Sequence, residues 1–349
     1  MKTRLIYFLY LILAISCTKA SSSSLKLDVV TGINNEATGT KAIVIGDNFV
    51  SGNTFGLFVY YAENQTGPLQ QYRSYGDMYS NIKAQKGTQG EWTYTLNGSS
   101  SLIDGFFVLE PSVEGLSAVA VCAYAPYSAA ATSINKIPFS IGGKYSKIID
   151  LMWATQNYDS DNLYIEPKGD KETVYLTFKH ALAMLEFGFK CDHPDTEMQV
   201  TSIKIKKAGA TKLYSDGFFD AVNAEFFSFT EADEVVFDFT SEGRVYSFDD
   251  TQYLYLPVLI IPQKYLADGD YVIEFTFNNQ TLPVTYPIPK EYLTEYIIEN
   301  EDGTKESIRA FVQGKVYTFE FDFNNYAQIR NVNVNESDVW PAEVYSMEF

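Results

Sequence analysis

The chain has 349 residues, of which 46% are hydrophobic and 20% are charged. This length is too great for one compact sheet sandwich and suits two domains, and the apolar content excludes a wholly disordered chain. The net charge of −18 would repel a polyanion, so nucleic acid is excluded as a partner.

The first residues have the pattern of an export signal. Lys2 and Arg4 precede an apolar run over 5–15, which is shorter than the roughly 20 residues that a membrane helix requires. We therefore predict a signal peptide over residues 1–16.

Cys17 is the predicted point of attachment to the membrane. A small residue before a cysteine at the end of such a run resembles the bacterial lipobox, in which the cysteine becomes the lipidated first residue, although Ala14 stands where leucine is usual. An ordinary cleaved signal is the alternative. The serines at 21–24 favour the lipobox, because they would make residues 17–24 a flexible tether for a lipid-anchored domain.

The rest of the chain is predicted to be all-β. β-Branched and aromatic residues are concentrated in short segments separated by Gly, Asn, Ser and Asp, which indicates strands. In the first half, these segments are 41–45, 55–61, 92–96, 106–109, 116–124 and 137–141. In the second half, they are 174–178, 184–189, 200–205, 235–239, 253–261, 271–277 and 316–323. Only 80–85, 180–184 and 289–296 suit a short helical turn.

The polar stretch at 156–172 is the predicted domain boundary. We expect an N-terminal β-sandwich domain over 25–155, a linker over 156–172 and a C-terminal β-sandwich domain over 173–349.

No catalytic, cofactor or metal site is predicted. The chain has only His180 and His193, and it lacks the HExxH helix, the GxSxG elbow and a glycine-rich phosphate loop. His180 lies at a predicted strand end, where a structural role competes with a ligand role. Oxygen side chains alternate over 157–162 as in a calcium loop, but Asn162 replaces the turn glycine and Lys168 the bidentate glutamate.

Two cysteines, Cys122 and Cys191, remain if Cys17 is acylated. Export permits a disulfide between them, while two separate buried thiols are the alternative. No Cys/His spacing indicates zinc.

Several segments together resemble the fimbrillin family, the lipoprotein-derived pilins of anaerobic Gram-negative bacteria. The segments are FKHALAMLEF at 178–187, NTFGLFV at 53–59, VCAYAPY at 121–127, DLMWA at 150–154, LIIPQ at 259–263, QGKVYTF at 313–319, and 332–334 leading to Trp340. Asn53 and Thr54 depart from the family pattern. The resemblance implies tandem transthyretin-like β-sandwich domains, an outer-membrane lipoprotein precursor held by lipid at Cys17, and no enzymatic activity.

The resemblance also implies polymerisation by strand exchange, in which a protease removes the first strand and a neighbouring subunit fills the groove. Leu25, Leu27 and Val29 alternate as a removable first strand would. The candidate cut lies between Lys41 and Ala42. The family's usual residue there is arginine, so either a broader protease acts or the first strand stays.

The C-terminal region holds two candidate donor segments. Ile329, Val332 and Val334 precede Trp340, and a second apolar alternation follows to the end of the sequence. That second set is Tyr345, Met347 and Phe349. An edge strand within the same chain is the alternative role for either segment.

Three functions are therefore open. The first is a structural pilin subunit, of shaft or tip, whose partners are other pilin subunits and which contributes to adhesion on the cell-surface fimbrium. The second is an uncleaved, outer-membrane-anchored base protein or an adhesin for a host or bacterial surface glycan or protein. The third is an exported hydrolase on a β scaffold. Aromatic residues in a flat exposed patch would favour sugar binding, and aromatic residues buried in cores would not.

Overall fold

The chain was analysed as a computed structural model. It describes residues 25–33, 49, 51–62, 73–74, 79–99, 102–104, 107–109, 118–155, 171–191, 198–209, 212–240, 246–265, 269–278, 280–299, 304–324 and 329–337. These residues form strands in several sheets, with two short 3-10 turns, so the all-β prediction is confirmed. Among them, no helix has the length and hydropathy needed to cross a bilayer.

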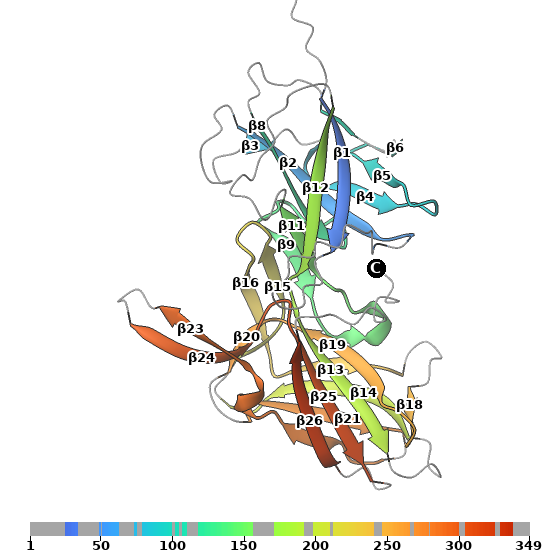
Figure 1. Ribbon diagram of the computed structural model, residues 1–349, viewed down its shortest axis with the longest axis vertical. Helices are drawn as coiled ribbons and strands as arrows, with labels where there is room; N and C mark the ends of the chain where they lie inside the picture. Colours follow the sequence, from blue (N-terminus) through green and yellow to red (C-terminus); the bar gives the residue numbers. More distant parts are fainter. Residues whose placement is uncertain are drawn as a thin grey trace, which may run out of the picture.

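A ten-stranded sheet is built mainly from the first half of the chain (Figure 1). Its order is β6-β5-β4-β2-β8-β11-β12-β1-β7, with β3 paired to β2. The strands are β1 (Leu25–Ile33), β2 (Thr54–Ala62), β3 (Arg73–Ser74), β4 (Ile82–Lys86), β5 (Trp92–Thr95), β6 (Leu102–Asp104), β7 (Phe107–Leu109), β8 (Ala118–Ala125), β11 (Met152–Thr155) and β12 (Lys171–His180).

Two larger sheets make up most of the second half. One has the order β19-β13-β25-β26, and the other has the order β10-β17-β14-β21-β22 with β18 paired to β14. The strands of the first are β13 (Ala183–Cys191), β19 (Leu254–Ile260), β25 (Val316–Phe323) and β26 (Ile329–Ser337). The strands of the second are β10 (Gly143–Lys144), β14 (Met198–Lys207), β17 (Glu234–Asp238), β18 (Ser247–Phe248), β21 (Tyr271–Phe277) and β22 (Val284–Pro287).

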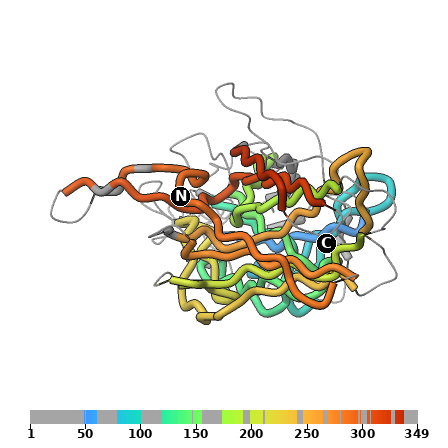
Figure 2. The backbone as a smooth tube through the Cα atoms, turned by 90° about the horizontal axis from the view of Figure 1, so that it is seen from below, coloured from blue at the N-terminus to red at the C-terminus, as the bar shows by residue number. Residues whose placement is uncertain are grey.

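Two three-stranded sheets complete the fold. They have the orders β16-β15-β9 and β20-β24-β23. Their strands are β9 (Ile137–Ser140), β15 (Leu213–Asp220), β16 (Glu225–Ala232), β20 (Gln263–Tyr265), β23 (Thr294–Glu299) and β24 (Lys305–Phe311). The hairpin of β23 and β24 reaches out from the rest of the chain as an arm (Figure 2).

The described residues enclose two hydrophobic cores. The smaller core lies on one face of the ten-stranded sheet and includes Phe55, Trp92 and Phe178. The larger core lies between the two larger sheets and continues to the opposite face of β2 and β8. Strand β8 is buried on both faces for this reason, and its sequence AVAVCAYA is continuously apolar rather than alternating. Most of the aromatic residues of the chain that the structure describes lie in these cores.

Strand pairing crosses the predicted domain boundary in both directions. Strand β12 begins in the last two residues of the predicted linker and continues beyond it, yet it pairs with β11 and β1 in the ten-stranded sheet. Strands β9 and β10 precede the linker and pair with β15 and β17. The division at 156–172 stays a prediction, but these pairings place β12 with the N-terminal sheet and not with the residues that follow it.

The short helical turns were only partly predicted. The turn η4 (Lys290–Tyr292) falls within 289–296, and a second turn, η3 (Tyr145–Lys147), was not expected. The predictions at 80–85 and 180–184 are wrong. Residues 82–86 form β4, in which alternate side chains are buried. The second segment is buried throughout and links β12 to β13.

Candidate functional site

Strand β1 lies between β12 and β7 in the ten-stranded sheet. Figure 1 shows it beside β12. It pairs in parallel with β12, from Lys26↔Lys171 to Ile33↔Phe178. On its other side it pairs antiparallel with the short strand β7. The predicted removable residues, Leu25, Leu27 and Val29, all belong to β1.

Strand β12 presents a row of buried apolar residues beside β1. Val174, Leu176 and Phe178 belong to the smaller core, whereas Tyr175 is 56% exposed on the other face of the sheet. This alternation is expected for a strand with one buried face. The register pairs the buried residues with Val29, Thr31 and Ile33 of β1.

Phe178 anchors this row in an aromatic cluster. Its ring centroid lies 5.1 Å from that of Phe49 and 5.5 Å from that of Phe55. Phe55 in turn packs edge-on against Trp92 at 4.5 Å. Such pairs contribute about 0.5–1.5 kcal/mol beyond the area that they bury. The apolar row of β12 beside β1 is therefore firmly packed in the smaller core.

Where the chain passes from β12 toward the larger core, two buried side chains are hydrogen-bonded to each other. His180 Nδ1 lies 2.8 Å from Asp150 Oδ2, and both side chains are at most 5% exposed. Asp150 Oδ1 has no hydrogen-bond partner among the described residues. The amide of Ala181 donates to the carbonyl of Leu151 at 2.7 Å. His180 thus has a structural setting at the junction of the two cores.

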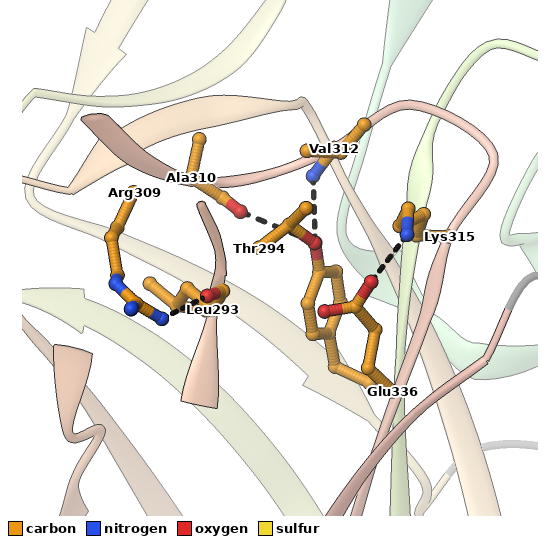
Figure 3. Close-up of polar contacts among 8 residues, drawn as sticks. Leu293, Thr294, Arg309, Ala310, Val312, Lys315 and Glu336 are labelled. Carbon is orange, nitrogen blue, oxygen red and sulfur yellow. Dashed lines mark hydrogen bonds and ion pairs between the residues drawn. The ribbon is translucent and has the colours of Figure 1, made fainter. Parts of the chain in front are cut away.

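Strand β26 holds the first candidate donor segment. Ile329, Val332 and Val334 are partly buried and pack against the larger core. The strand pairs antiparallel with β25 of the same chain, and among the described strands it lies at the edge of its sheet. Lys315 and Glu336 form an ion pair that joins the two strands (Figure 3). In this structure β26 therefore acts as an edge strand within its own chain.

A cavity of about 420 Å³ lies where the arm joins the body. It is lined by Pro262, Gln263, Thr294, Ala310, Phe311, Val312 and Gln313. The hydroxyl of Tyr317 is bonded at this point to Thr294 Oγ1, at 2.7 Å, and it accepts from the amide of Val312 at 3.0 Å (Figure 3). Among the described residues that line it, none is Asp, Glu, His, Lys or Arg.

The remaining predicted site residues lie outside the described residues. They are Cys17, Lys41, Ala42, Tyr345, Met347 and Phe349. The structure therefore brings β1 and its neighbours together but does not place the anchor, the cut or the second donor segment.

Both remaining cysteines are buried and free in the structure. Burial raises the pKa of the Cys122 thiol to about 12, so this thiol stays protonated and unreactive at neutral pH. The Cys191 thiol lies 3.5 Å from the carbonyl of Asn324.

Sequence reasoning did not find the partner of His180 or the cavity at the arm. Asp150 is thirty positions before His180, and no local pattern connects the two. The cavity is lined by common polar and apolar residues from three strands and their connections. Across the part of the chain that is described, no group of His, Cys, Asp or Glu side chains could hold a metal ion.

The described residues form an all-β protein of several sheets, in which β1 lies between β12 and the edge strand β7. The model of the fimbrillin-like family matches residues 40–338, and the chain belongs to this family. The family consists of structural pilins, so the chain is a structural protein and not an enzyme.

Solved structures show the same fold. A candidate cell adhesion protein from Bacteroides ovatus is 18% identical, with a TM-score of 0.56 over 91% of this chain and 98% of that chain. One from Bacteroides uniformis is 14% identical, with a TM-score of 0.52 over 91% of this chain and all of that chain. No curated protein matches the sequence.

Proposed function

We propose that the chain is a subunit of surface fimbriae, of shaft or tip, that is exported as a lipoprotein precursor and assembles by donor-strand exchange. Lipid at Cys17 would hold the precursor to the outer membrane. A cut between Lys41 and Ala42 would release β1, and a strand from another subunit would take its place. The assembled fibre would contribute to adhesion, as the descriptions of the Bacteroides neighbours suggest.

The position of β1 is the observation that supports this proposal most directly. Because β1 lies between β12 and β7, its loss would leave unpaired backbone groups on β12. It would also uncover one side of the row Val174, Leu176 and Phe178. Burying each such side chain contributes roughly 1.5–3 kcal/mol, so an incoming strand that covers this row would be favoured.

The donor would come from the C-terminal region. Strand β26 is already paired with β25, so its use as a donor would require this pairing to break. A donor strand that uses Tyr345, Met347 and Phe349 would leave the pairing of β25 with β26 intact. We therefore favour residues 338–349 as the donor over Ile329, Val332 and Val334.

Limited proteolysis tests the proposal. Trypsin treatment of residues 18–349 should yield a new N-terminus at Ala42 and then a ladder of oligomers on a gel. Lys41→Ala should block both results. Lys41→Arg is the matched control, because trypsin still cuts after arginine, and it should also admit an arginine-specific protease.

Removal of residues 338–349 should suppress the ladder while the cut and the fold are retained. Chains that stay monomeric after a confirmed cut at Lys41 would contradict strand exchange. That result would favour an uncleaved, membrane-anchored base protein or adhesin, for which the lysine in place of the family's arginine is the supporting observation.

A further inference from the structure

One face of the sheet of β19, β13, β25 and β26 is divided: Met184, Leu259 and Val316 at one end belong to the larger core, and the other end carries polar and aromatic side chains. The side chains at that other end include Tyr253, Tyr255, Glu320, Asp322, Asn331 and Asn333, which we call the tyrosine face. Tyr255 is 42% exposed, so it presents an aromatic ring to solvent on a flat sheet face.

Strand register places the residues of the tyrosine face in rows across the sheet. Tyr255 pairs with Gly188, Gly188 with Glu320, and Glu320 with Asn333. In the adjacent row, Asp322 pairs with Asn331. Strands are about 4.8 Å apart, so a row across four strands is about 14 Å long. An aromatic ring, a carboxylate and an amide thus lie in line on a flat surface.

Gly188 lets the ring of Tyr255 lie against the sheet. A Cβ atom at this position would meet Tyr255 Cε1 at 2.8 Å and Cδ1 at 3.2 Å. Glycine inside a strand weakens the strand and often marks a close approach of another group. The Tyr255 ring therefore lies over Gly188, while 42% of the residue is exposed to solvent.

Hydrogen bonds fix both tyrosine rings. The Tyr255 hydroxyl donates to Glu320 Oε1 at 2.6 Å, and the Tyr253 hydroxyl donates to Asp322 Oδ1 at 2.8 Å. The two ring centroids are 5.8 Å apart. Burial and the neighbouring carboxylate raise the pKa of Tyr253 to about 12, so its hydroxyl remains a donor. Rings held in this way lose little freedom when a ligand binds.

The chemistry of the tyrosine face fits a sugar better than a protein or an anion. A pyranose ring has an apolar C–H face that stacks on an aromatic ring, and hydroxyl groups at its edge that bond carboxylates and amides. Protein interfaces instead have an apolar centre from which carboxylates are depleted. Acidic ligands would be repelled by Glu320 and Asp322, whose charge only Lys190 opposes within the two rows.

We propose that the tyrosine face binds a neutral oligosaccharide, with Tyr253 and Tyr255 as the stacking platform and Glu320, Asp322 and the asparagines as partners for its hydroxyls. The inference names a ligand for the adhesive part of the proposed function. It does not depend on strand exchange, since β1, Lys41 and residues 338–349 are not part of the tyrosine face.

A glycan array tests this proposal with the purified chain of residues 18–349. The array carries neutral glucans, mannans and N-acetyllactosamine chains, together with sialylated and sulfated glycans. We expect binding to neutral members, and titration calorimetry with the strongest of them then gives the dissociation constant. Tyr255→Ala should raise this constant about 2- to 12-fold, which corresponds to the loss of one aromatic contact.

Two further variants serve as controls. Tyr175→Ala removes an exposed tyrosine from the other half of the molecule and should leave the dissociation constant unchanged. Tyr255→Phe keeps the ring and should weaken binding less than Tyr255→Ala. Far-ultraviolet circular dichroism and thermal melting check that each variant is folded.

Three results would overturn the proposal. They are a lack of binding to any neutral glycan, binding only to acidic glycans, and binding that the double variant Tyr253→Ala/Tyr255→Ala does not change. Polymerisation after cleavage at Lys41 should be the same in the variants of Tyr253 and Tyr255. Failure of the glycan proposal is therefore distinguishable from failure of strand exchange.

Discussion

The first and last described strands, β1 and β26, are held in different ways. Strand β1 pairs in parallel with β12, and on its other side it meets only the three residues of β7. Strand β26 is antiparallel to β25 along its length, and the Lys315–Glu336 ion pair joins the two. Parallel pairing is slightly less stable per residue. The two strands therefore differ in how they are held: β1 has a ladder on each side, whereas β26 has one ladder and an ion pair.

The hydrophobic cores beside the two strands also differ, because β12 next to β1 faces the smaller core and β26 packs against the larger one. Strand β12 faces the smaller core, whose residues come from the ten-stranded sheet. The candidate residues of β26 pack against the larger core, which extends from the C-terminal sheets to the second face of β2 and β8. Loss of β1 would thus affect one small core, while loss of β26 would affect the core that joins the two halves.

The largest expected effect is in the smaller core. Phe178→Ala should lower the free energy of unfolding by about 3–5 kcal/mol, because it empties a fully buried position in the aromatic cluster. Hydrogen exchange should show faster opening of β1 and β12 but not of β26. Phe321→Ala is the matched control in the larger core, and it should instead loosen β25 and β26. Equal loosening of all four strands in both variants would contradict the difference between the two regions.

The next largest effect is expected at the junction between the two regions, where His180 contacts Asp150. His180→Leu should lower the free energy of unfolding by about 3 kcal/mol, because it removes the group bonded to Oδ2 of the buried Asp150 side chain. The end of β12 beside Ile33 should lose protection in hydrogen exchange. His180→Gln can still donate to Asp150 and should cost less. An unchanged melting temperature for His180→Leu would show that the pair does not support the junction.

A smaller effect is expected at the ion pair between Lys315 and Glu336, which holds the end of β26. Lys315→Ala removes the ion pair with Glu336, whose side chains are 25% and 32% exposed. Partly exposed pairs contribute about 0.2–1 kcal/mol. The amides of Ser337 and its neighbours should exchange faster, while β1 is unaffected. Glu336→Gln should have a similar effect, and faster exchange in β1 would contradict the separation of the two strands.

The smallest effect concerns Glu186 on the outer side of β13. Burial is the main cause that raises its pKa above the ordinary value, against the opposing hydrogen bond from Thr318 Oγ1. A carboxyl with a raised folded pKa binds its proton more tightly in the folded state. It therefore favours folding at pH values below its ordinary pKa and ceases to do so as the pH rises through the folded pKa. Glu186→Gln, which stays neutral and can accept the same bond, should raise the melting temperature slightly at pH 7 and not at pH 4.

Much of the fold follows from the sequence, because a strand with one buried face alternates visibly. The segments at 92–96, 200–205 and 316–323 coincide with β5, β14 and β25 within one or two residues. Strands β15 and β16 were missed, since Gly217 and the polar residues around it break the alternation. Their positions are fixed by pairing with each other and with β9.

The candidate site was less predictable than the fold. The alternation of Leu25, Leu27 and Val29 predicts a strand, and β1 is one. Its neighbours β12 and β7 are far apart in sequence, so their pairing with β1 depends on long-range topology that no local pattern contains. The tyrosine face was not predicted either. In the sequence, Tyr253 and Tyr255 have the pattern of ordinary strand residues. Only the strand register shows that Gly188 and Glu320 lie in the same row as Tyr255.

Hydrogen exchange on the peptide Lys171–His180 tests the removable strand most directly. Three samples are compared: the uncut chain, the chain cut after Lys41 without residues 338–349, and the assembled oligomers. We expect the amides of β12 to be protected in the first, to lose protection in the second and to regain it in the third. Protection of β12 that is unchanged by the cut, or that does not return on assembly, would contradict the exchange of β1 for a donated strand.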